Sequence, residues 1–317
     1  MLLHPVHMHI PDGFLSVVVS AVLWMLSSAG VAWALRRAGK DLGDRQVPLM
    51  GVLAAAIFAG QMLNFSIAGG TSGHLLGAAI ATILLGPWPA VIVLTTVVGI
   101  QALIFQDGGL VALGANLFNM AILGVAVSYF VYASLRRALR TDPWGLLVSG
   151  FAAAWCSIFI SALAAALELA ASGTSPANVA VPAMGSIHAL IGVGEGFITV
   201  GALTFLYASR RDLLHAQPEG ARAGGAVWAF GLAAALLLAV LSPLASAHPD
   251  GLMRVAEQEG FLGAARSPLF SLIPHYVFPG ISNGVVATMA AAIVGTLLVF
   301  GVALGAAYLH RKRRPST

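Results

Sequence analysis

Long apolar stretches separated by short polar connections constrain this chain more than any other feature of its sequence. Only 9% of the 317 residues are charged, whereas about a quarter are charged in a soluble globular domain. So little polar material cannot cover a surface exposed to water, and the chain is therefore predicted to lie in a membrane. Nine apolar runs follow one another, at residues 14–35, 47–66, 74–86, 88–105, 110–135, 145–170, 184–208, 226–245 and 284–309.

The third and fourth runs decide how many times the chain crosses the membrane. A spanning helix needs about 20 residues, so the run 74–86 is short, and Pro-Trp-Pro at 87–89 ends it sharply. We interpret 74–105 as two helices joined by a tight turn. The expected fold is all-α: a polytopic integral membrane protein with about nine transmembrane helices, located in the bacterial inner membrane.

The basic residues predict the orientation. Fourteen of the 16 Lys and Arg residues follow the first, fifth, seventh and ninth runs. Lys and Arg concentrate in cytoplasmic loops, so nine spans with an extracytoplasmic N-terminus and a cytoplasmic C-terminus put all four clusters inside. The same topology puts residues 8–9, the 67–74 loop, Asp107 and the 171–183 loop together on the extracytoplasmic side.

A polar stretch divides the chain into two units. Residues 209–225 contain Gln-Pro-Glu-Gly and Gly-Gly and are predicted to form a cytoplasmic linker. The linker separates a seven-helix unit, residues 1–208, from a two-helix unit, residues 226–317. The extracytoplasmic loop of the second unit, residues 246–283, is too polar for the bilayer, and within it 255–263 is expected to form a short amphipathic helix.

The segment 8–13, Met-His-Ile-Pro-Asp-Gly, lies just outside the first run and is the strongest candidate for a binding site. A methionine that begins a chain and is followed by histidine can bind a metal ion through its amine, the next amide nitrogen and the imidazole. These three nitrogens share a plane whose fourth position stays open for a second imidazole, and such a set favours Ni(II) or Cu(II) over Zn(II) or Mg(II). The prediction requires Met8 to be the first residue, although seven residues precede it in the sequence.

His74 is the candidate for the fourth position. It follows a glycine-rich run, Gly-Gly-Thr-Ser-Gly, whose glycines let backbone approach closely, and the predicted topology puts it on the same face as His9. The Pro-Asp-Gly turn at 11–13 would fix the path of the N-terminal segment, which makes Asp12 a candidate supporting residue. The alternative is that both histidines are interfacial side chains beside helix ends.

His188 and Glu195 are seven residues apart and therefore share one face of the predicted seventh helix. A carboxylate inside a membrane helix is costly and is usually functional or paired. Two roles stay open: a buried hydrogen-bonded pair that holds helices together, or direct contact with a metal ion. Glu168 is expected at the membrane interface, and Asn116 and Asn119 are expected to bond between helices.

An enzymatic alternative rests on Gly-Thr-Ser-Gly at 70–73, where Ser72 could pair with His188 as the dyad of an intramembrane serine protease. The match is short, and the serine lies in a glycine-rich loop rather than in a helix. Neither Lys40 nor Lys312 lies in a Gly-Lys-Ser/Thr loop, and no His-Glu-x-x-His occurs, so neither an ATPase nor a zinc protease is expected. The chain is expected to be no enzyme, to use no organic cofactor and to bind no nucleic acid.

Five short motifs lie in order along the first unit: Met-His-Ile-Pro-Asp-Gly-Phe-Leu at 8–15, Gly-Thr-Ser-Gly-His-Leu-Leu-Gly at 70–77, Gln-Asp-Gly-Gly at 106–109, Gly-Ala-Asn-Leu-Phe-Asn-Met at 114–120 and His-x-x-Ile-Gly-x-Gly-Glu at 188–195. Together they resemble the CbiM/NikM family, the substrate-capturing membrane subunits of energy-coupling-factor transporters for cobalt and nickel. The resemblance covers essentially all of residues 8–208. It implies a metal ion held by the amine of Met8, the amide and imidazole of His9, and the imidazole of His74.

The second unit carries a resemblance of its own. Ser-Pro-Leu-Ala-Ser-Ala-His-Pro-Asp-Gly-Leu at 242–252 resembles the Pro-Asp-Gly-Leu-Glu segment of the small NikN/CbiN-type component, although Met253 stands where that motif has Glu. The chain thus resembles a fusion of two components. The resemblance implies that Ni(II), or alternatively Co(II), is the transported substrate, and that two separate ATPase subunits drive uptake through a coupling membrane component. A stand-alone secondary metal permease is the other transport alternative.

Overall fold

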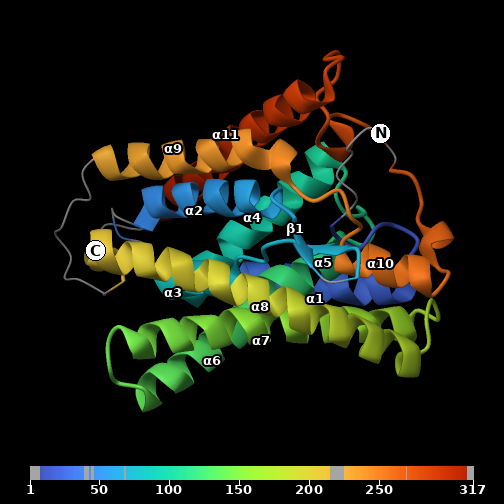
Figure 1. Cartoon of the computed structure of the whole chain (residues 1–317), viewed down its shortest axis with the longest axis horizontal. Helices are drawn as coiled ribbons and strands as arrows, with labels where there is room; N and C mark the ends of the chain where they lie inside the picture. Colours follow the sequence, from blue (N-terminus) through green and yellow to red (C-terminus); the bar gives the residue numbers. More distant parts are fainter. Residues whose placement is uncertain are drawn as a thin grey trace.

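The structure, a computed structural model, describes residues 8–38, 43, 46–67, 69–214, 225–268 and 270–312. It is mostly helical, as predicted, and its long helices lie side by side so that their ends gather at two opposite ends of the molecule (Figure 1). The elements up to residue 214 are α1 (Val17–Ala38), α2 (Gln46–Gln61), β1 (Phe65–Ile67), β2 (Thr71–Gly73), α3 (Ala78–Leu85), α4 (Pro87–Phe105), α5 (Leu113–Asn116), the π-helix η1 (Leu117–Leu123), α6 (Gly124–Ala138), α7 (Trp144–Ala171), α8 (Ala177–Ser209) and the short 3₁₀ helix η2 (Arg211–Leu213).

Residues 225–312, called the C-terminal segment below, form a helix, a loop region and a second long helix. Most of the predicted linker, residues 215–224, lies outside the described residues. The elements are α9 (Gly225–Leu241), α10 (Gly251–Gln258), α11 (Gly284–Lys312) and three short 3₁₀ helices, η3 (Ser242–Leu244), η4 (Leu262–Ala264) and η5 (Pro274–Tyr276). The predicted amphipathic loop helix exists as α10, but it begins four residues earlier because Asp250 accepts a hydrogen bond from the Leu252 amide as its N-cap.

Each of the nine apolar runs contains a helix, and six helical stretches in the described residues are long and apolar enough to cross a membrane. The helices α2 and α9 are shorter, and α3 has only eight residues, or about 12 Å of length. The break between α3 and α4 lies at Gly86, whose φ of 80° is left-handed, and Pro87 then begins α4 without losing a bonded amide. The turn therefore precedes the predicted Pro-Trp-Pro segment rather than coinciding with it.

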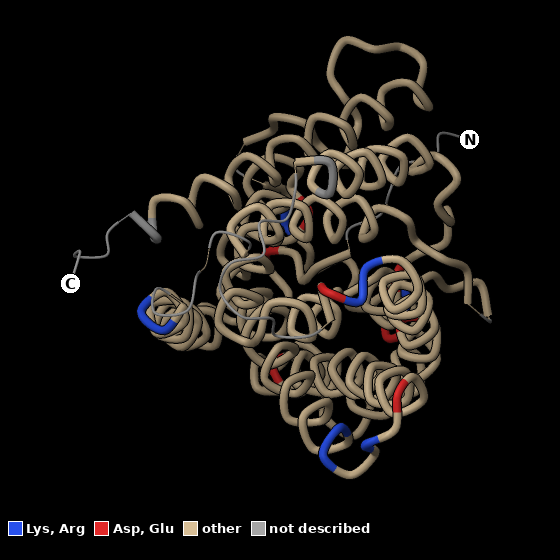
Figure 2. The backbone as a smooth tube through the Cα atoms, turned by 90° about the vertical axis from the view of Figure 1, so that its left-hand side faces the viewer, with Lys and Arg blue, Asp and Glu red and all other residues tan. Residues whose placement is uncertain are grey.

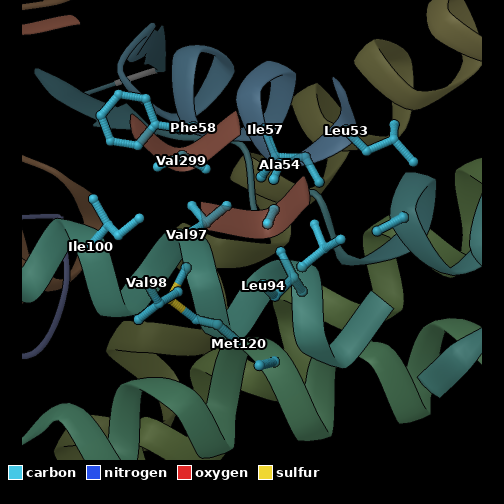
Figure 3. Packing of buried hydrophobic residues seen from close by; sticks show 14 of the residues in the cluster. Leu53, Ala54, Ile57, Phe58, Leu94, Val97, Val98, Ile100, Met120 and Val299 are labelled. Atoms are coloured by element: carbon cyan, nitrogen blue, oxygen red, sulfur yellow. The ribbon is translucent and has the colours of Figure 1, made fainter. Parts of the chain in front are cut away.

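The core lies between α2, α4, η1 and α11, where Figure 3 shows aliphatic side chains of all four elements in contact. Helix α2 has apolar residues on every face and no polar stripe. This fits its position, because α4 packs on one side of it and the C-terminal segment on another. Figure 1 shows α9 and α11 beside α2. The C-terminal segment is thus packed into the same helical body as the rest of the chain.

The two ends of this body differ in charge. One end carries α10 and the loop between α7 and α8, whereas the other end carries the α6–α7 connection (Figure 1). Arg36 and Arg37 lie in the last turn of α1, and Arg136 and Arg137 in the last turn of α6. Figure 2 looks onto this second end and shows basic residues on several of its connections.

Close contact between α1 and α5 makes a prediction for Gly114. A Cβ atom at this position would lie 2.5 Å from the backbone nitrogen of Trp24 and 2.6 Å from its Cα, so the Gly114→Ala variant must push two helices apart. We expect it to lower the free energy of unfolding by about 1–3 kcal/mol. The matched control is Gly301→Ala in α11, where a Cβ meets nothing within 4 Å. Thermal unfolding in detergent measures both, and equal melting temperatures would contradict the packing.

Candidate metal site

The N-terminal segment 8–14 enters the structure as extended, buried chain rather than as helix. Non-helical backbone away from water must find hydrogen-bond partners, and here side-chain amides and backbone supply them. Asn116 bonds Ile10 at both its amide and its carbonyl, each at 3.0 Å, and the Gly109 amide donates to the Ile10 carbonyl at 2.9 Å. The segment is therefore held against the loop that follows α4 and against the first turn of α5.

Asp12 fixes the other side of this arrangement. Its carboxylate accepts hydrogen bonds from the amides of Leu110 at 3.1 Å and Ala112 at 3.0 Å. The Pro-Asp-Gly turn is present, with Gly13 at a φ of 95°, a value that favours glycine. Asp12 thus supports the loop 107–112 through that loop's backbone amides rather than through another side chain.

Asp107 is the centre of this loop, and it is 98% buried. Its Oδ1 accepts a hydrogen bond from the Met8 amide at 2.8 Å and a longer one from the His9 amide at 3.3 Å. The Nδ1 atom of His9 lies 3.7 Å from the same Oδ1 and 3.2 Å from the Asp107 carbonyl oxygen. Three nitrogens of Met8 and His9 therefore surround one carboxylate oxygen.

Tyr276, from the C-terminal segment, holds the other oxygen of Asp107. Its hydroxyl donates to Oδ2 at 2.6 Å, and its ring stacks on Phe105 with centroids 4.8 Å apart. Burial and the negative charge of Asp107 raise the pKa of Tyr276 well above its ordinary value, so the phenol stays protonated and remains a donor. A residue near the far end of the chain thus fixes the carboxylate that contacts Met8 and His9.

His74 follows the small hairpin in which β1 pairs antiparallel with β2. Its ring centroid lies 5.6 Å from that of His9, at 84° between the ring planes. The Nδ1 atom lies 3.0 Å from the Leu75 carbonyl oxygen; this bond fixes the ring and leaves Nε2 as the nitrogen suited to a metal ion. Burial lowers the pKa of His74, but Asp250, the Leu75 carbonyl and other carboxylates raise it, and the net shift is upward.

Glu195, on α8, supports the chain just after His74. Its two oxygens accept hydrogen bonds from the amides of Leu76 at 2.7 Å and Gly77 at 2.9 Å. Gly77 is the residue before α3 and has no side chain to cap that helix, so Glu195 supplies the negative charge that a helix N-terminus favours. The expected His188–Glu195 pair is absent from the described residues, because His188 Nδ1 lies instead 2.8 Å from the Met184 carbonyl oxygen.

One cavity of about 70 Å³ joins these groups. A water molecule needs about 10–15 Å³ of such a cavity, so this one has room for an ion with several waters. Its wall includes Met8, His9, His74 and His188 from the predicted set, together with Asp250 from the C-terminal segment, and the remainder is Ile10, Leu76, Asn116, Asn119, Met120, Ile158, Ser161, Ala162, Ala165, Met184, Ile191 and Leu252. Among the described residues, no three His, Cys, Asp or Glu side chains converge as a metal site by themselves, so these side chains alone do not form a complete ligand set.

Glu168 and Ser72 each have a partner that the sequence did not indicate. Glu168, near the end of α7, is buried and accepts a hydrogen bond from Asn119 at 2.8 Å. Ser72 donates to the His248 carbonyl at 2.8 Å. Within the part of the chain that the structure describes, Ser72 makes no hydrogen bond to His188, so the geometry gives the protease interpretation no dyad.

Sequence reasoning missed three residues of this site. Asp107 was treated as part of a turn, Asp250 as part of a motif in the second unit, and Tyr276 was not singled out. Only the Asp-Gly-Gly and Pro-Asp-Gly signatures, placed on the same face as His9 by the predicted topology, could have indicated the two aspartates. Nothing in the sequence around Tyr276 predicts its contact.

The sequence was compared with protein families and with solved structures. Residues 9–213 match the CbiM family, described as "Cobalt uptake substrate-specific transmembrane region", and residues 225–312 match the PDGLE domain. A putative fused nickel transport protein NikMN of Archaeoglobus fulgidus is 38% identical over 309 residues, which are 96% of this chain and 99% of that protein.

Two further relatives cover less of the chain. The fused nickel transport protein NikMN of Rhodobacter capsulatus is 37% identical over 65% of this chain and 64% of its own length. A crystal structure of a truncated transition metal transporter, 36% identical, superposes with a TM-score of 0.57 over 63% of this chain and 99% of its own. With its apolar helices, the chain is a multi-pass membrane protein, and it belongs to the CbiM family of nickel and cobalt transport components, with a PDGLE domain fused behind the CbiM region.

Proposed function

We propose that this protein is the substrate-capturing membrane component of an ATP-driven energy-coupling-factor transporter that takes up Ni(II) in preference to Co(II). The ligands would be the nitrogen atoms of Met8 and His9 and the imidazole of His74. The energy would come from two ATPase subunits acting through a coupling membrane component, since the sequence contains no nucleotide-binding loop of its own.

One observation carries this proposal: the Met8 nitrogen, the His9 amide and His9 Nδ1 lie 2.8, 3.3 and 3.7 Å from a single oxygen of Asp107. Three nitrogen atoms that lie around one point are positioned to bind one metal ion once they have given up their hydrogen bonds to Asp107. With His74 beside them the donor set is entirely nitrogen, which suits Ni(II) in a planar site. The nickel named in two fused relatives supports the same choice.

The metal ion is cargo, and its capture would exchange waters for protein nitrogens. Binding requires these nitrogens to give up protons, including any on His74, whose pKa is raised. Asp107 already accepts the two backbone hydrogens, so its negative charge would stay beside the ion when those bonds are replaced. Glu195 would keep the chain after His74 in place while this happens.

The topology is part of the proposal. Nine spans, with the end that carries the cavity outside and the end that carries the basic clusters inside, agree with the positive-inside rule. The cavity would then open toward the source of metal, and the short connections at the opposite end would be the docking surface for the coupling component. The distribution of Arg36, Arg37, Arg136 and Arg137 supports this orientation.

The first prediction from this proposed function concerns His74. The His74→Ala variant is expected to lose more Ni(II) affinity than the roughly 10- to 100-fold that removal of a ligand's outer partner costs, because one of four ligands disappears. His248→Ala is the matched control, since His248 is an exposed imidazole at the same end of the molecule. Isothermal titration of purified protein measures both affinities, and equal values for the two variants would rule His74 out as a ligand.

The second prediction concerns the start of the chain. Residues 1–7 lie outside the described residues, and a Met8 amine is a better ligand than a Met8 peptide nitrogen. A chain that begins at Met8 is therefore expected to bind Ni(II) more tightly than one that begins at Met1. The control begins at Met8 but carries an acetylated amine, which removes the amine ligand and keeps His9 in place. Intact mass identifies the natural start; tight binding by a natural protein that begins at Met1 would contradict the chelate.

The third prediction concerns the energy source. In vesicles, Ni(II) uptake is expected only when the ATPase and coupling subunits are reconstituted with this chain and ATP is supplied. Radioactive nickel accumulation measures the rate. Uptake by this chain alone under an ion gradient would instead establish a secondary permease.

A further inference from the structure

The C-terminal segment reaches the cavity beside the β1–β2 hairpin. The Ser72 amide donates to the Pro249 carbonyl at 2.9 Å, and the Ser72 hydroxyl donates to the His248 carbonyl at 2.8 Å. Ser72 and Asp250 also form a parallel bridge beside the hairpin. Backbone pairing two residues before His74 therefore fixes where Asp250 lies.

Asp250 is 98% buried and forms part of the cavity wall together with Met8, His9 and His74. Its Oδ2 atom caps α10 through the Leu252 amide at 3.4 Å. Its Oδ1 atom has no hydrogen-bond partner among the described residues. A buried carboxylate oxygen without a partner is costly, so a ligand bound in the cavity that supplied a partner would stabilise it.

The charges around the cavity indicate what that ligand is. Glu195 is compensated by the N-terminus of α3, whereas Asp107 and Asp250 are two buried carboxylates near one cavity. Asp250 and His74 line the same cavity, so the charge of Asp250 lies close to that ring. Two buried carboxylates attract a divalent cation more strongly than a monovalent one.

We propose that Asp250 is a positioning residue for the divalent ion, acting through a bridging water from outside its four nitrogen ligands rather than by direct coordination. Direct coordination is disfavoured because the nitrogens of Met8, His9 and His74 already fill the planar ligand set proposed above. The cavity volume of about 70 Å³ leaves room for the bridging water. The C-terminal segment would thereby supply the charge that retains a divalent ion. This inference rests on the proposed function.

The test removes the charge and keeps the cap. Asn caps a helix as well as Asp does, so Asp250→Asn should preserve α10. We expect it to weaken Ni(II) binding by about 10- to 100-fold, the usual cost of losing an outer partner, while Ag(I) binding changes much less. Glu259→Gln is the matched control, because it removes one negative charge from an exposed residue at the end of the same helix, and its Ni(II) affinity should equal that of the unchanged protein.

Two further readouts separate positioning from structure. The visible absorption of bound Ni(II) should keep its band position in Asp250→Asn, and the melting temperature of the metal-free protein should stay unchanged. Equal Ni(II) affinity in Asp250→Asn and Glu259→Gln would overturn the inference, and so would equal losses for Ni(II) and Ag(I). Asp250→Ser, a second neutral cap, repeats the test; if neither neutral variant folds, Asp250 is structural and the inference fails. Failure of the unchanged protein to bind Ni(II) would instead reject the proposed function.

Discussion

Non-helical backbone buried at the end of a membrane helix bundle has no water to bond, and three carboxylates meet that need here. Asp12 accepts the amides of Leu110 and Ala112, Asp107 those of Met8 and His9, and Glu195 those of Leu76 and Gly77. Hydrogen bonds to a charged acceptor are stronger than neutral ones, so each carboxylate fixes a stretch of irregular chain that has no helical pairing. The cavity exists because these stretches are held in place around it.

This arrangement also separates the tasks of the acidic residues. Asp12 and Glu195 act on backbone that lies beyond the candidate ligands, and their positions do not depend on an ion. Asp107 contacts the candidate ligands themselves, so an ion arriving there would compete with its hydrogen bonds and gain from its charge. The π-helix η1 adds to the same region, because Asn119 and Met120 lie within it and line the cavity; π-helical turns often occur at functional sites.

The sequence predicted the helices well, because a run of apolar residues has only one way to satisfy its backbone in a membrane. It predicted the position of the break between α3 and α4 less well, because that break depends on the φ angle of a single glycine, Gly86. His9 and His74 could be brought together from topology alone. Asp107 and Tyr276 could not, since their contact joins residues 169 positions apart and nothing local distinguishes Tyr276 from any other loop tyrosine. The hydrogen bond between Glu168 and Asn119 could not be predicted either, because the two residues lie on different elements.

The tripeptide Pro-Asp-Gly occurs twice, at 11–13 and at 249–251, and its aspartate has a different role in each copy because the surrounding structure differs. In the first copy, Asp12 has both oxygens occupied by amides of a neighbouring loop. In the second, a helix begins directly after the motif, so Asp250 uses one oxygen as the cap, the other has no partner among the described residues, and the residue lines the cavity. The first copy therefore holds the loop that carries Asp107, whereas the second adds a buried carboxylate to the cavity wall. Because residues 225–312 follow the CbiM region in one chain, that carboxylate lines the same cavity as His74.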